Sequence, residues 1–270
     1  MQTPHVPETE VHAGNPRHAD RAGHSTFDDR GAVSTRGRSC GAARRGIALA
    51  AAMLLAAATL LATAPRAFAD EIWHLDNLKE IGGHPVRVVG SPSVVGVKGG
   101  KAIAFDGAHD GIFVPSIPTA GGKAFTIEVL MSPAPDGPQA QRFFHVQDTT
   151  GRRILIEIRT NHEGGWWLDG FERTASDPKD HGLTLIDPKQ VHPVGRWYWV
   201  ALRYDGKRLA NFVNGKKQLD GARDFDALGD GQISIGVRQN LVYWFKGRIR
   251  EVRFHREAIP DDKLQRAGER

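Results

Sequence analysis

Thiols are almost absent from this 270-residue chain, whose single cysteine, Cys40, lies in the polar N-terminal part. One cysteine cannot close a disulfide within the chain, so the fold must rest on a packed core rather than on covalent links. A lipoprotein cysteine would directly follow a long apolar run, and no cysteine does so here, so lipid anchoring is not indicated. A long amphipathic helix is also missing from the pattern, which leaves strands as the main expected element.

The one long apolar run, Ile47 to Ala64, follows the pair Arg44-Arg45 and precedes Ala67-Phe68-Ala69. A basic flank, an apolar stretch and such a small-residue site are typical of a secretory signal peptide, which we expect over residues 44–69 with cleavage after Ala69. The alternative is a retained membrane anchor, because the 18 apolar residues are near the lower limit for a spanning helix. The arginine pair fits both general secretion and twin-arginine export. We expect residues 1–43 to be a disordered leader or to precede the true start.

The basic excess of the chain belongs largely to this leader. Residues 1–69 contain 8 of the 36 basic residues and 5 of the 31 acidic ones, which leaves 28 basic and 26 acidic residues, a net +2, in residues 70–270. So small an excess gives little support for a nucleic-acid partner. Because of the predicted signal peptide, we expect an exported protein, periplasmic or extracellular, with no stable membrane anchor after cleavage.

The remaining sequence alternates between apolar and polar residues in several short runs. Residues 125–131, 154–159 and 232–238 each place branched or aromatic side chains at every second position. In RFFHVQD, the same alternation predicts that Phe143, His145 and Gln147 share one face. A period of two indicates strands with one face buried, and many such strands separated by turns indicate an antiparallel sandwich or barrel.

The segment RWYWVALRYDGKRLANFVNGKK, residues 196–217, carries large side chains on both faces of its first strand. Asp205-Gly206 and Asn214-Gly215 are favoured at tight hairpin turns, so the segment predicts a three-strand meander. Because both faces are bulky, we expect a central strand that is covered on both sides, and its aromatic residues to belong mainly to the core.

Five motifs follow one another in this part of the chain: AIAFDGAHDGIFVP, AFTIEVLMSP, GRWYWVALRYDGKRLANFVNGKK, GQISIGV and WFKGRIREVRFHREAI. In this order they closely resemble the laminin-G-like branch of the concanavalin A-like lectin/glucanase superfamily, over residues 71–258. The resemblance implies an all-β jelly-roll sandwich of two curved antiparallel sheets, in agreement with the alternation. We therefore expect one laminin-G-like domain over residues 70–270. Arg250 and Leu130 replace an aspartate and a tryptophan of the family pattern.

The resemblance also implies a candidate calcium site, because acidic residues around the F-D-G loop often assist a calcium ion in related domains. Asp106 and Asp110 are the acids of this loop. Calcium takes six to eight oxygen ligands, so these two acids would need help from carbonyl oxygens. The alternative is a plain turn between two strands.

Catalysis is the less favoured interpretation. Hydrolases of the superfamily carry paired carboxylates on one strand, and no such pair is present here; Glu128 and Glu157 would have to meet across strands. We expect Arg159, the same-face neighbour of Glu157, to keep that carboxylate charged. His145, Gln147, Arg159 and Tyr243 resemble part of a polysaccharide-lyase set, with a solvated outer face as the alternative.

Aromatic rings mixed with planar polar groups suit a sugar, which offers C–H faces and paired hydroxyls. The residues predicted for such a site are His145, Glu157, Arg159, Trp167, Asp169, Arg238 and Trp244. We therefore predict an exported, non-catalytic module that binds a glycan or cell-envelope polysaccharide, with a protein partner as the next choice. The alternatives are a glycan-cleaving hydrolase or lyase of the same fold, and a structural interaction domain without a sugar site.

Overall fold

The computed structural model describes residues 71–268 except 162 and 175–178. The predicted signal peptide and the residues before it therefore lie outside the described part. All described elements belong to one compact unit, Arg66–Arg270. Among the described residues, no helix has the length and hydropathy that a membrane span needs. The described secondary structure consists of strands and one short 3-10 helix, η2 (Asp261–Lys263), where the sequence allows a short helical tail.

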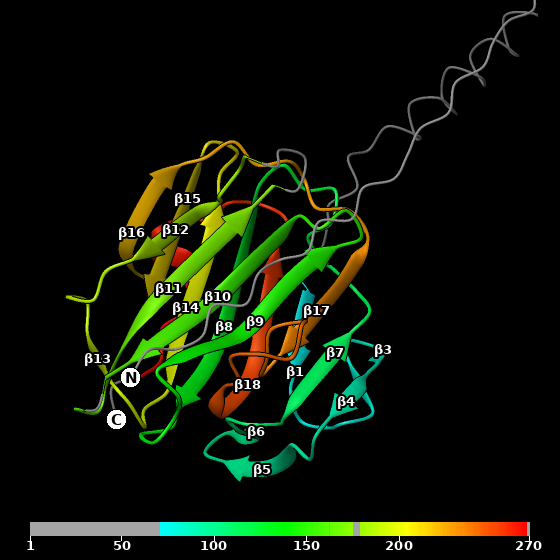
Figure 1. The fold of residues 1–270 in the computed structure, drawn as a ribbon, viewed down its shortest axis with the longest axis vertical. Coiled ribbons are helices and arrows are strands. Elements are labelled where there is room, and N and C mark those ends of the chain that lie inside the picture. Colours follow the sequence, from blue (N-terminus) through cyan, green and yellow to red (C-terminus); the bar gives the residue numbers. More distant parts are fainter. Residues whose placement is uncertain (1–70, 162, 175–178, 269–270) are drawn as a thin grey trace, which may run out of the picture. The chain divides into compact units, whose positions relative to one another are not determined.

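Two antiparallel sheets form the fold (Figure 1). Sheet I has the strand order β16 (Lys216–Ala222), β15 (Arg208–Val213), β14 (Tyr198–Tyr204), β8 (Phe125–Pro133), β18 (Lys246–His255), β6 (Gly100–Asp106) and β5 (Ser93–Val97), and β1 (Glu71–His74) also pairs with β18. Sheet II has the order β12 (Leu183–Ile186), β11 (Gly165–Arg173), β10 (Arg153–Thr160), β9 (Ala140–Asp148), β17 (Gly231–Ile235), β7 (Gly111–Val114) and β4 (Arg87–Val89), and β13 (His192–Pro193) pairs with β11. A separate hairpin joins β2 (Glu80–Ile81) to β3 (His84–Pro85).

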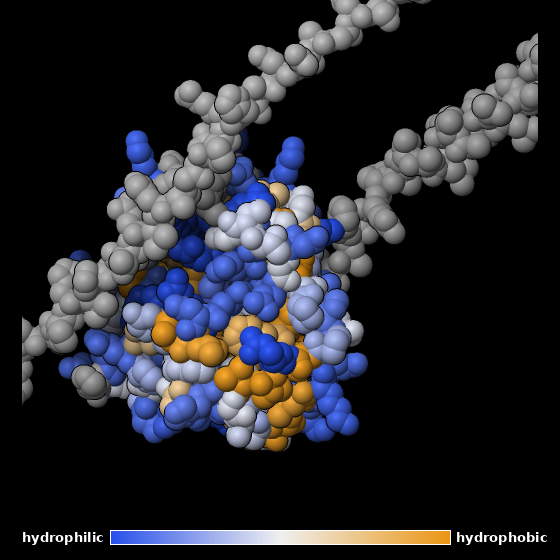
Figure 2. Space-filling model, turned by 45° about the vertical axis from the view of Figure 1, so that its right-hand side comes forward, coloured by the Kyte–Doolittle hydropathy of each residue, from blue (hydrophilic) through white to orange (hydrophobic). Residues whose placement is uncertain are grey.

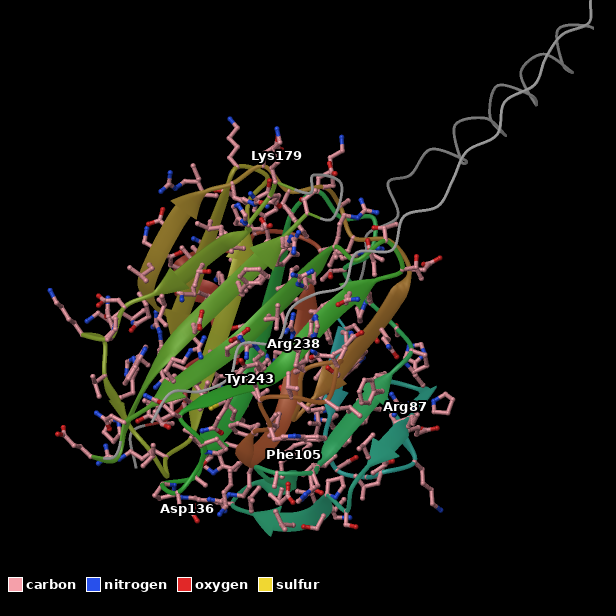
Figure 3. All side chains as sticks on the ribbon, in the orientation of Figure 1. Arg87, Phe105, Asp136, Lys179, Arg238 and Tyr243 are labelled. Atoms are coloured by element: carbon pink, nitrogen blue, oxygen red, sulfur yellow. The ribbon has the colours of Figure 1, made fainter. Side chains whose placement is uncertain are left out.

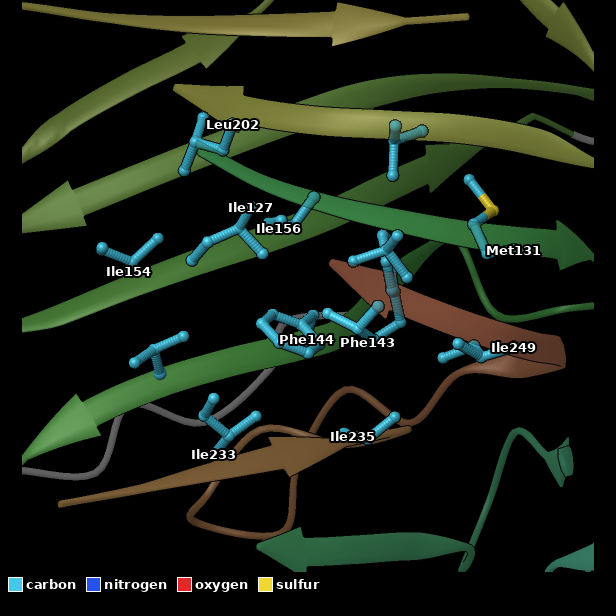
Figure 4. Close-up of a cluster of buried hydrophobic side chains, with 14 of the residues drawn as sticks. Ile127, Met131, Phe143, Phe144, Ile154, Ile156, Leu202, Ile233, Ile235 and Ile249 are labelled. Carbon is cyan, nitrogen blue, oxygen red and sulfur yellow. The ribbon is translucent and has the colours of Figure 1, made fainter. Parts of the chain in front are cut away.

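The core lies between the two sheets, and the alternating residues supply it (Figure 4). The every-second-residue positions predicted to point inward are fully buried: Ile127, Val129, Met131, Ile154, Ile156, Ile158, Ile233 and Ile235. Tyr198, Val200, Leu202 and Tyr204 belong to the same core. The all-β sandwich expected from the period of two is therefore confirmed, because the alternate positions of both sheets face one shared interior.

The predicted turns of the meander also form. Asn214 and Gly215 both have positive φ, 48° and 71°, as a tight type of hairpin turn requires. At the other turn Gly206 has φ 92°, and the Asp205 carboxylate accepts hydrogen bonds from the backbone N–H of Lys207 and Arg208.

The outward face of sheet I is covered in part by the chain's own C-terminal segment. Ile259 and Leu264 pack with Ala201, Ala210 and Phe212 in a second apolar cluster. Glu128, on β8 and fully buried, accepts a hydrogen bond from the backbone N–H of Gln265 at 2.7 Å and contacts the His255 ring at 3.1 Å. β14 is thus central and covered on both sides, as its two bulky faces predict.

An ion-pair cluster joins the ends of the two sheets. Arg223, which follows β16 of sheet I, donates through Nε to both carboxylate oxygens of Glu172 on β11 of sheet II, at 2.8 and 2.6 Å. The Glu172 side chain is fully buried, whereas 18 % of the Arg223 side chain is exposed. Arg223 also pairs with Asp180 in the loop after β11. A buried carboxylate held in this way is stable only while its cation remains in place.

Candidate functional site

The outward face of sheet II gathers most of the residues that the sequence predicts as a site. Ile154, Ile156 and Ile158 point into the core, so Glu157 and Arg159 point outward from the same strand, β10. The register places Asp169 of β11 directly opposite Glu157, and Trp167 opposite Arg159. On the other side of β10, His145 of β9 lies opposite Leu155. We call this surface, with Arg142, His145, Glu157, Arg159, Trp167 and Asp169, the candidate face.

Two arginines of the candidate face lie over two acidic side chains. Arg142 Nε donates to Glu157 at 2.9 Å, and Arg159 Nε and Nη2 donate to one oxygen of Asp169 at 2.9 and 2.7 Å. Arg159 also lies 3.6 Å from the second Glu157 oxygen. The acids form the floor of the face, with side chains 4 % and 2 % exposed, while the arginines are more accessible, at 16 % for Arg142 and 27 % for Arg159.

Burial and charged neighbours act against each other on the Glu157 carboxylate. Burial raises the pKa of Glu157 to about 7, and the Asp169 carboxylate adds to that rise. Arg142 and Arg159 oppose it without cancelling it. Arg159 thus favours the charged form, as expected, but the loss of hydration outweighs its attraction.

His145 is held in one neutral form. Burial, followed by the charges of Arg238, Arg153 and Arg142, lowers the pKa of His145 to about 3. The backbone N–H of Gln239 donates to Nδ1 at 3.1 Å, so the neutral ring carries its proton on Nε2. That Nε2 is buried and has no geometrically well-formed hydrogen bond within the described structure, although the Gln147 side chain interacts with the ring.

The loop between β17 and β18 lies over the same face. The guanidinium of Arg142 stacks on the Tyr243 ring, 3.6 Å from its centre, and the Arg142 backbone N–H donates to the Tyr243 carbonyl at 2.9 Å. Figure 3 shows Tyr243 and Arg238 together over the strands of sheet II. The larger exposed apolar side chains include Leu241 and Val242 of this loop. Figure 2 shows one face of the molecule, on which an apolar area has hydrophilic surroundings.

Phe143 faces the core instead of sharing a face with His145, and Arg142, which the sequence did not indicate, lies on the candidate face. A register shift between β9 and β10, at Ile156 and Glu157, marks a β-bulge. The bulge turns Phe143 into the core, where it is fully buried, while His145 points outward, so the predicted shared face of these two residues is wrong. The same bulge brings Arg142 onto the candidate face. An arginine that precedes two consecutive phenylalanines was the only signal for it in the sequence.

Trp244 lies apart from the other predicted residues. Its ring is 6.5 Å from that of His109, and it borders Gly111 at the start of β7, two strands beyond β9 in the sheet. Trp167, in contrast, is partly exposed on the candidate face, and its Nε1 has no hydrogen-bond partner among the described residues.

The acids proposed for calcium hold their own loop together. One Asp106 oxygen accepts hydrogen bonds from the backbone N–H of Ala108, His109 and Asp110. The Asp110 oxygens accept from the backbone N–H of Ser91 and Asp106. No group of three or more His, Cys, Asp or Glu side chains that could hold a metal occurs among the described residues. The loop thus has the geometry of the turn that was the alternative, and the calcium site stays a prediction.

Glu128 and Glu157 do not meet. Glu128 is on sheet I and Glu157 is on sheet II, and each points away from the core, so they lie on opposite sides of the sandwich. A pair of carboxyl groups about 5 Å apart, as a retaining hydrolase needs, is therefore not formed by these two residues.

The outward side of sheet I holds an open cleft of about 1360 Å³ that the sequence did not indicate. Trp197 and Trp199 contribute to its walls, and its charged lining residues are all basic: Lys98, Arg196, Lys216, Arg250 and Arg266. The guanidinium of Arg250 is held by the carbonyls of Lys98 and Gly99, at 3.1 and 2.5 Å. This cleft is distinct from the candidate face, because the core separates the two sheets.

Several polar atoms of the candidate face have no hydrogen-bond partner in the described structure. They are Arg142 Nη1, His145 Nε2, Trp167 Nε1 and Asp169 Oδ1. Native proteins leave few buried polar groups unpaired, so these four buried atoms are places where a water or a ligand group would find a partner once the side chains that cover them move aside. The arrangement places three buried donors and one buried acceptor on the same face as one partly exposed indole ring.

The chain matches a laminin-G-type family model, described as the concanavalin A-like lectin/glucanases superfamily, over residues 106–265, which is more than half of its length. The chain belongs to this superfamily, as the motifs predicted. Among curated proteins, none matches the sequence significantly.

Solved structures share the fold at low identity. Domain 4 of AbnA, an extracellular GH43 arabinanase from Geobacillus stearothermophilus solved with arabinotriose, has a TM-score of 0.53 and 18 % identity, and the match covers 72 % of this chain and 94 % of that one. The ligand-binding domain of botulinum neurotoxin serotype D, solved with N-acetylneuraminic acid, has a TM-score of 0.53 and 13 % identity, with 72 % and 49 % covered. The binding domain of Paraclostridial Mosquitocidal Protein 1 has a TM-score of 0.53 and 12 % identity, with 72 % and 50 % covered. The match thus spans about half of the two toxin domains.

Proposed function

We propose that this protein is an exported, non-catalytic binding module whose ligand is a glycan, held on the candidate face of sheet II. The observation that carries the proposal is the partly exposed Trp167 ring opposite Arg159, on the face that also carries the two arginine–carboxylate pairs. An indole ring offers a flat apolar surface to the C–H face of a sugar, and guanidinium, carboxylate and imidazole groups reach its hydroxyls. Export rests on the leader sequence, with its basic flank, apolar run and Ala67-Phe68-Ala69.

Two further observations favour a sugar and binding without chemistry. Two of the solved structures of this fold were determined with arabinotriose and with N-acetylneuraminic acid, both carbohydrates. The acids of the candidate face, Glu157 and Asp169, are each engaged by an arginine, which suits fixed recognition better than nucleophilic attack. A protein partner or a cell-envelope polysaccharide of particular composition would be distinguished by the experiment below.

A glycan array with the purified protein tests this proposal, followed by titration calorimetry of any ligand with Trp167→Ala. Loss of a stacking ring at the centre of a site costs about 2 kcal/mol, which is roughly thirtyfold in Kd. The matched control is Trp197→Ala, because Trp197 is also partly exposed but lines the cleft on the other sheet. The control should bind as the unaltered protein does, and both variants should retain their melting temperature within a few degrees.

Two results would overturn the proposal. One is an array without any glycan ligand, together with recovery of a protein partner through this face. The other is a glycan whose affinity survives Trp167→Ala but falls in Trp197→Ala, which would assign the site to sheet I.

A further inference from the structure

Three arginines at one end of the candidate face have no carboxylate partner among the described residues. Arg153 of β10 and Arg173 of β11 are directly opposite each other in the register, and Arg238 projects from the loop over the same strands (Figure 3). We call these residues the arginine cluster. All three are partly exposed, and none forms an ion pair with any described residue.

Like charges directly opposite each other in an antiparallel pair are destabilising. Burial, followed by the repulsion from the charges of Arg173 and Arg238, lowers the pKa of Arg153. The Asp180 carboxylate acts on Arg153 from a distance, but its oxygens are already engaged by Arg223 and by the backbone N–H of Thr174 and Gly182. Among the described residues, no carboxylate therefore forms an ion pair that neutralises the cluster.

The guanidinium groups are also held with donors to spare. Arg153 lies over the Phe171 ring at 5.6 Å, and its one described hydrogen bond is a long one, 3.5 Å to the Gly151 carbonyl. Arg153 Nε and Arg173 Nε are buried and have no hydrogen-bond partner in the described structure, whereas both side chains as a whole are partly exposed. The terminal N–H groups of a partly exposed guanidinium match a planar carboxylate, which accepts two parallel hydrogen bonds.

A donor of the candidate face lies close to this cluster. His145 lies on β9, directly opposite Leu155 of β10. Leu155 is the next outward-facing residue after Arg153 on β10, and His145 Nε2 has no well-formed hydrogen bond among the described residues. A chain of sugars that lies across β9, β10 and β11 would thus meet Trp167 and Arg159 toward one end of the strands and the arginine cluster toward the other.

We propose that the ligand of this face is an acidic glycan, and that the arginine cluster binds a carboxylate of one of its uronic-acid units. This inference rests on the glycan-binding function proposed above and adds the ligand's charge to it. The Arg142, Glu157, Arg159 and Asp169 groups then contact hydroxyls, while the cluster supplies the selectivity for the acid.

The test uses a panel of oligouronides, built from galacturonate, glucuronate, mannuronate or guluronate, each beside its carboxyl-reduced neutral form. We expect at least one uronide to bind more than tenfold more tightly than its reduced form. Arg153→Gln and Arg173→Gln should each remove about tenfold of that affinity and leave the reduced form's affinity unchanged. Arg196→Gln, an equal change of charge in the cleft of sheet I, is the matched control and should have no effect.

A melting curve supplies a second readout that does not depend on the ligand. Because the arginines repel one another, Arg153→Gln and Arg173→Gln should melt at or above the temperature of the unaltered protein. A variant that melts lower would show that the arginine is part of the structure rather than of a site.

The outcomes separate the two proposals. If neutral glycans bind in a Trp167-dependent way and no uronide is preferred, the acidic-glycan inference fails and the glycan-binding function stands. If no glycan binds at all, both fail. If binding falls equally in Arg196→Gln, the attraction is general and the cluster is not the site. If sulfated dextran binds in an Arg153-dependent way while uronides do not, the carboxylate assignment is overturned.

Discussion

Removal of the Arg223 side chain should destabilise the protein far more than an ordinary surface change. The fully buried Glu172 carboxylate receives both of its close contacts from Arg223 Nε, at 2.8 and 2.6 Å. Arg223→Met keeps the length of the side chain and removes the charge. Breaking a buried pair by removing one partner costs about 3–5 kcal/mol, because the remaining charge is uncompensated.

The protonation of Glu172 gives this deficit a pH dependence. Burial raises the pKa of Glu172 to about 7, and Arg223 opposes that rise. Without the arginine the pKa rises further, and each additional unit corresponds to about 1.4 kcal/mol of lost stability at a pH above it. A folded-state pKa above the unfolded value gives stability that is fully present below about pH 4.5 and is lost as the pH rises through the folded pKa.

The deficit of Arg223→Met should therefore be small near pH 4.5 and largest near pH 8. The Asp180 part of the cluster does not disturb this trend. Its pKa, lowered to about 2 by the hydrogen bond from Arg223, lies below the window in which Glu172 titrates. Urea denaturation at several pH values measures the free energy of unfolding directly.

The control is the double variant Arg223→Met with Glu172→Met, which removes both charges. Replacement of a buried ion pair by apolar side chains of similar volume is often neutral or stabilising, so most of the lost stability should return. A loss below about 1 kcal/mol in the single variant, or a loss that is equal at pH 5 and pH 8, would refute the view that Arg223 compensates a buried charge.

Two further predictions concern single side chains. Partial burial raises the pKa of Asp106, but the backbone N–H groups of its loop prevail and lower it to about 2. Its stabilising effect is present above about pH 4 and is lost as the pH falls through 2, so the melting temperatures of Asp106→Ala and the unaltered protein should differ at pH 6 and converge near pH 2. Glu128→Ala leaves the backbone N–H of Gln265 without its acceptor, which should cost about 1–3 kcal/mol. Hydrogen exchange should speed up over residues 259–265, and unchanged exchange there would contradict the role of Glu128 as the anchor of the C-terminal segment.

The alternation in the sequence was sufficient to predict the sandwich and much of the candidate face. Strands β9, β10 and β11 are consecutive and pair with their neighbours, so outward residues on them had to share one surface. Glu157, Arg159, Trp167 and Asp169 are brought together for this reason. The pattern of every second residue decides which side of a sheet a residue occupies, and neighbouring hairpins decide which residues are close.

The features that the sequence did not predict depend on irregular backbone or on distant pairs. The bulge that turns Phe143 inward breaks the period of two and leaves no composition signal of its own. The positions of Trp244 and Tyr243 follow from a loop in which Leu241 and Tyr243 take positive φ, 60° and 61°, which side chains other than glycine seldom adopt. Glu172 and its partner Arg223 are far apart in the sequence and meet only because the two sheets stack.

The two outward faces of the sandwich differ in what covers them, and this difference supports the proposed site. On sheet I the C-terminal segment supplies partners for the buried groups: Gln265 donates to Glu128, and Arg203 donates to the Ile259 carbonyl at 2.7 Å. On sheet II the donors of Arg142, His145 and Trp167 have no such partner among the described residues. An unpaired polar group costs free energy in the unliganded protein, and a ligand that pairs with several of them recovers that cost in a single binding event.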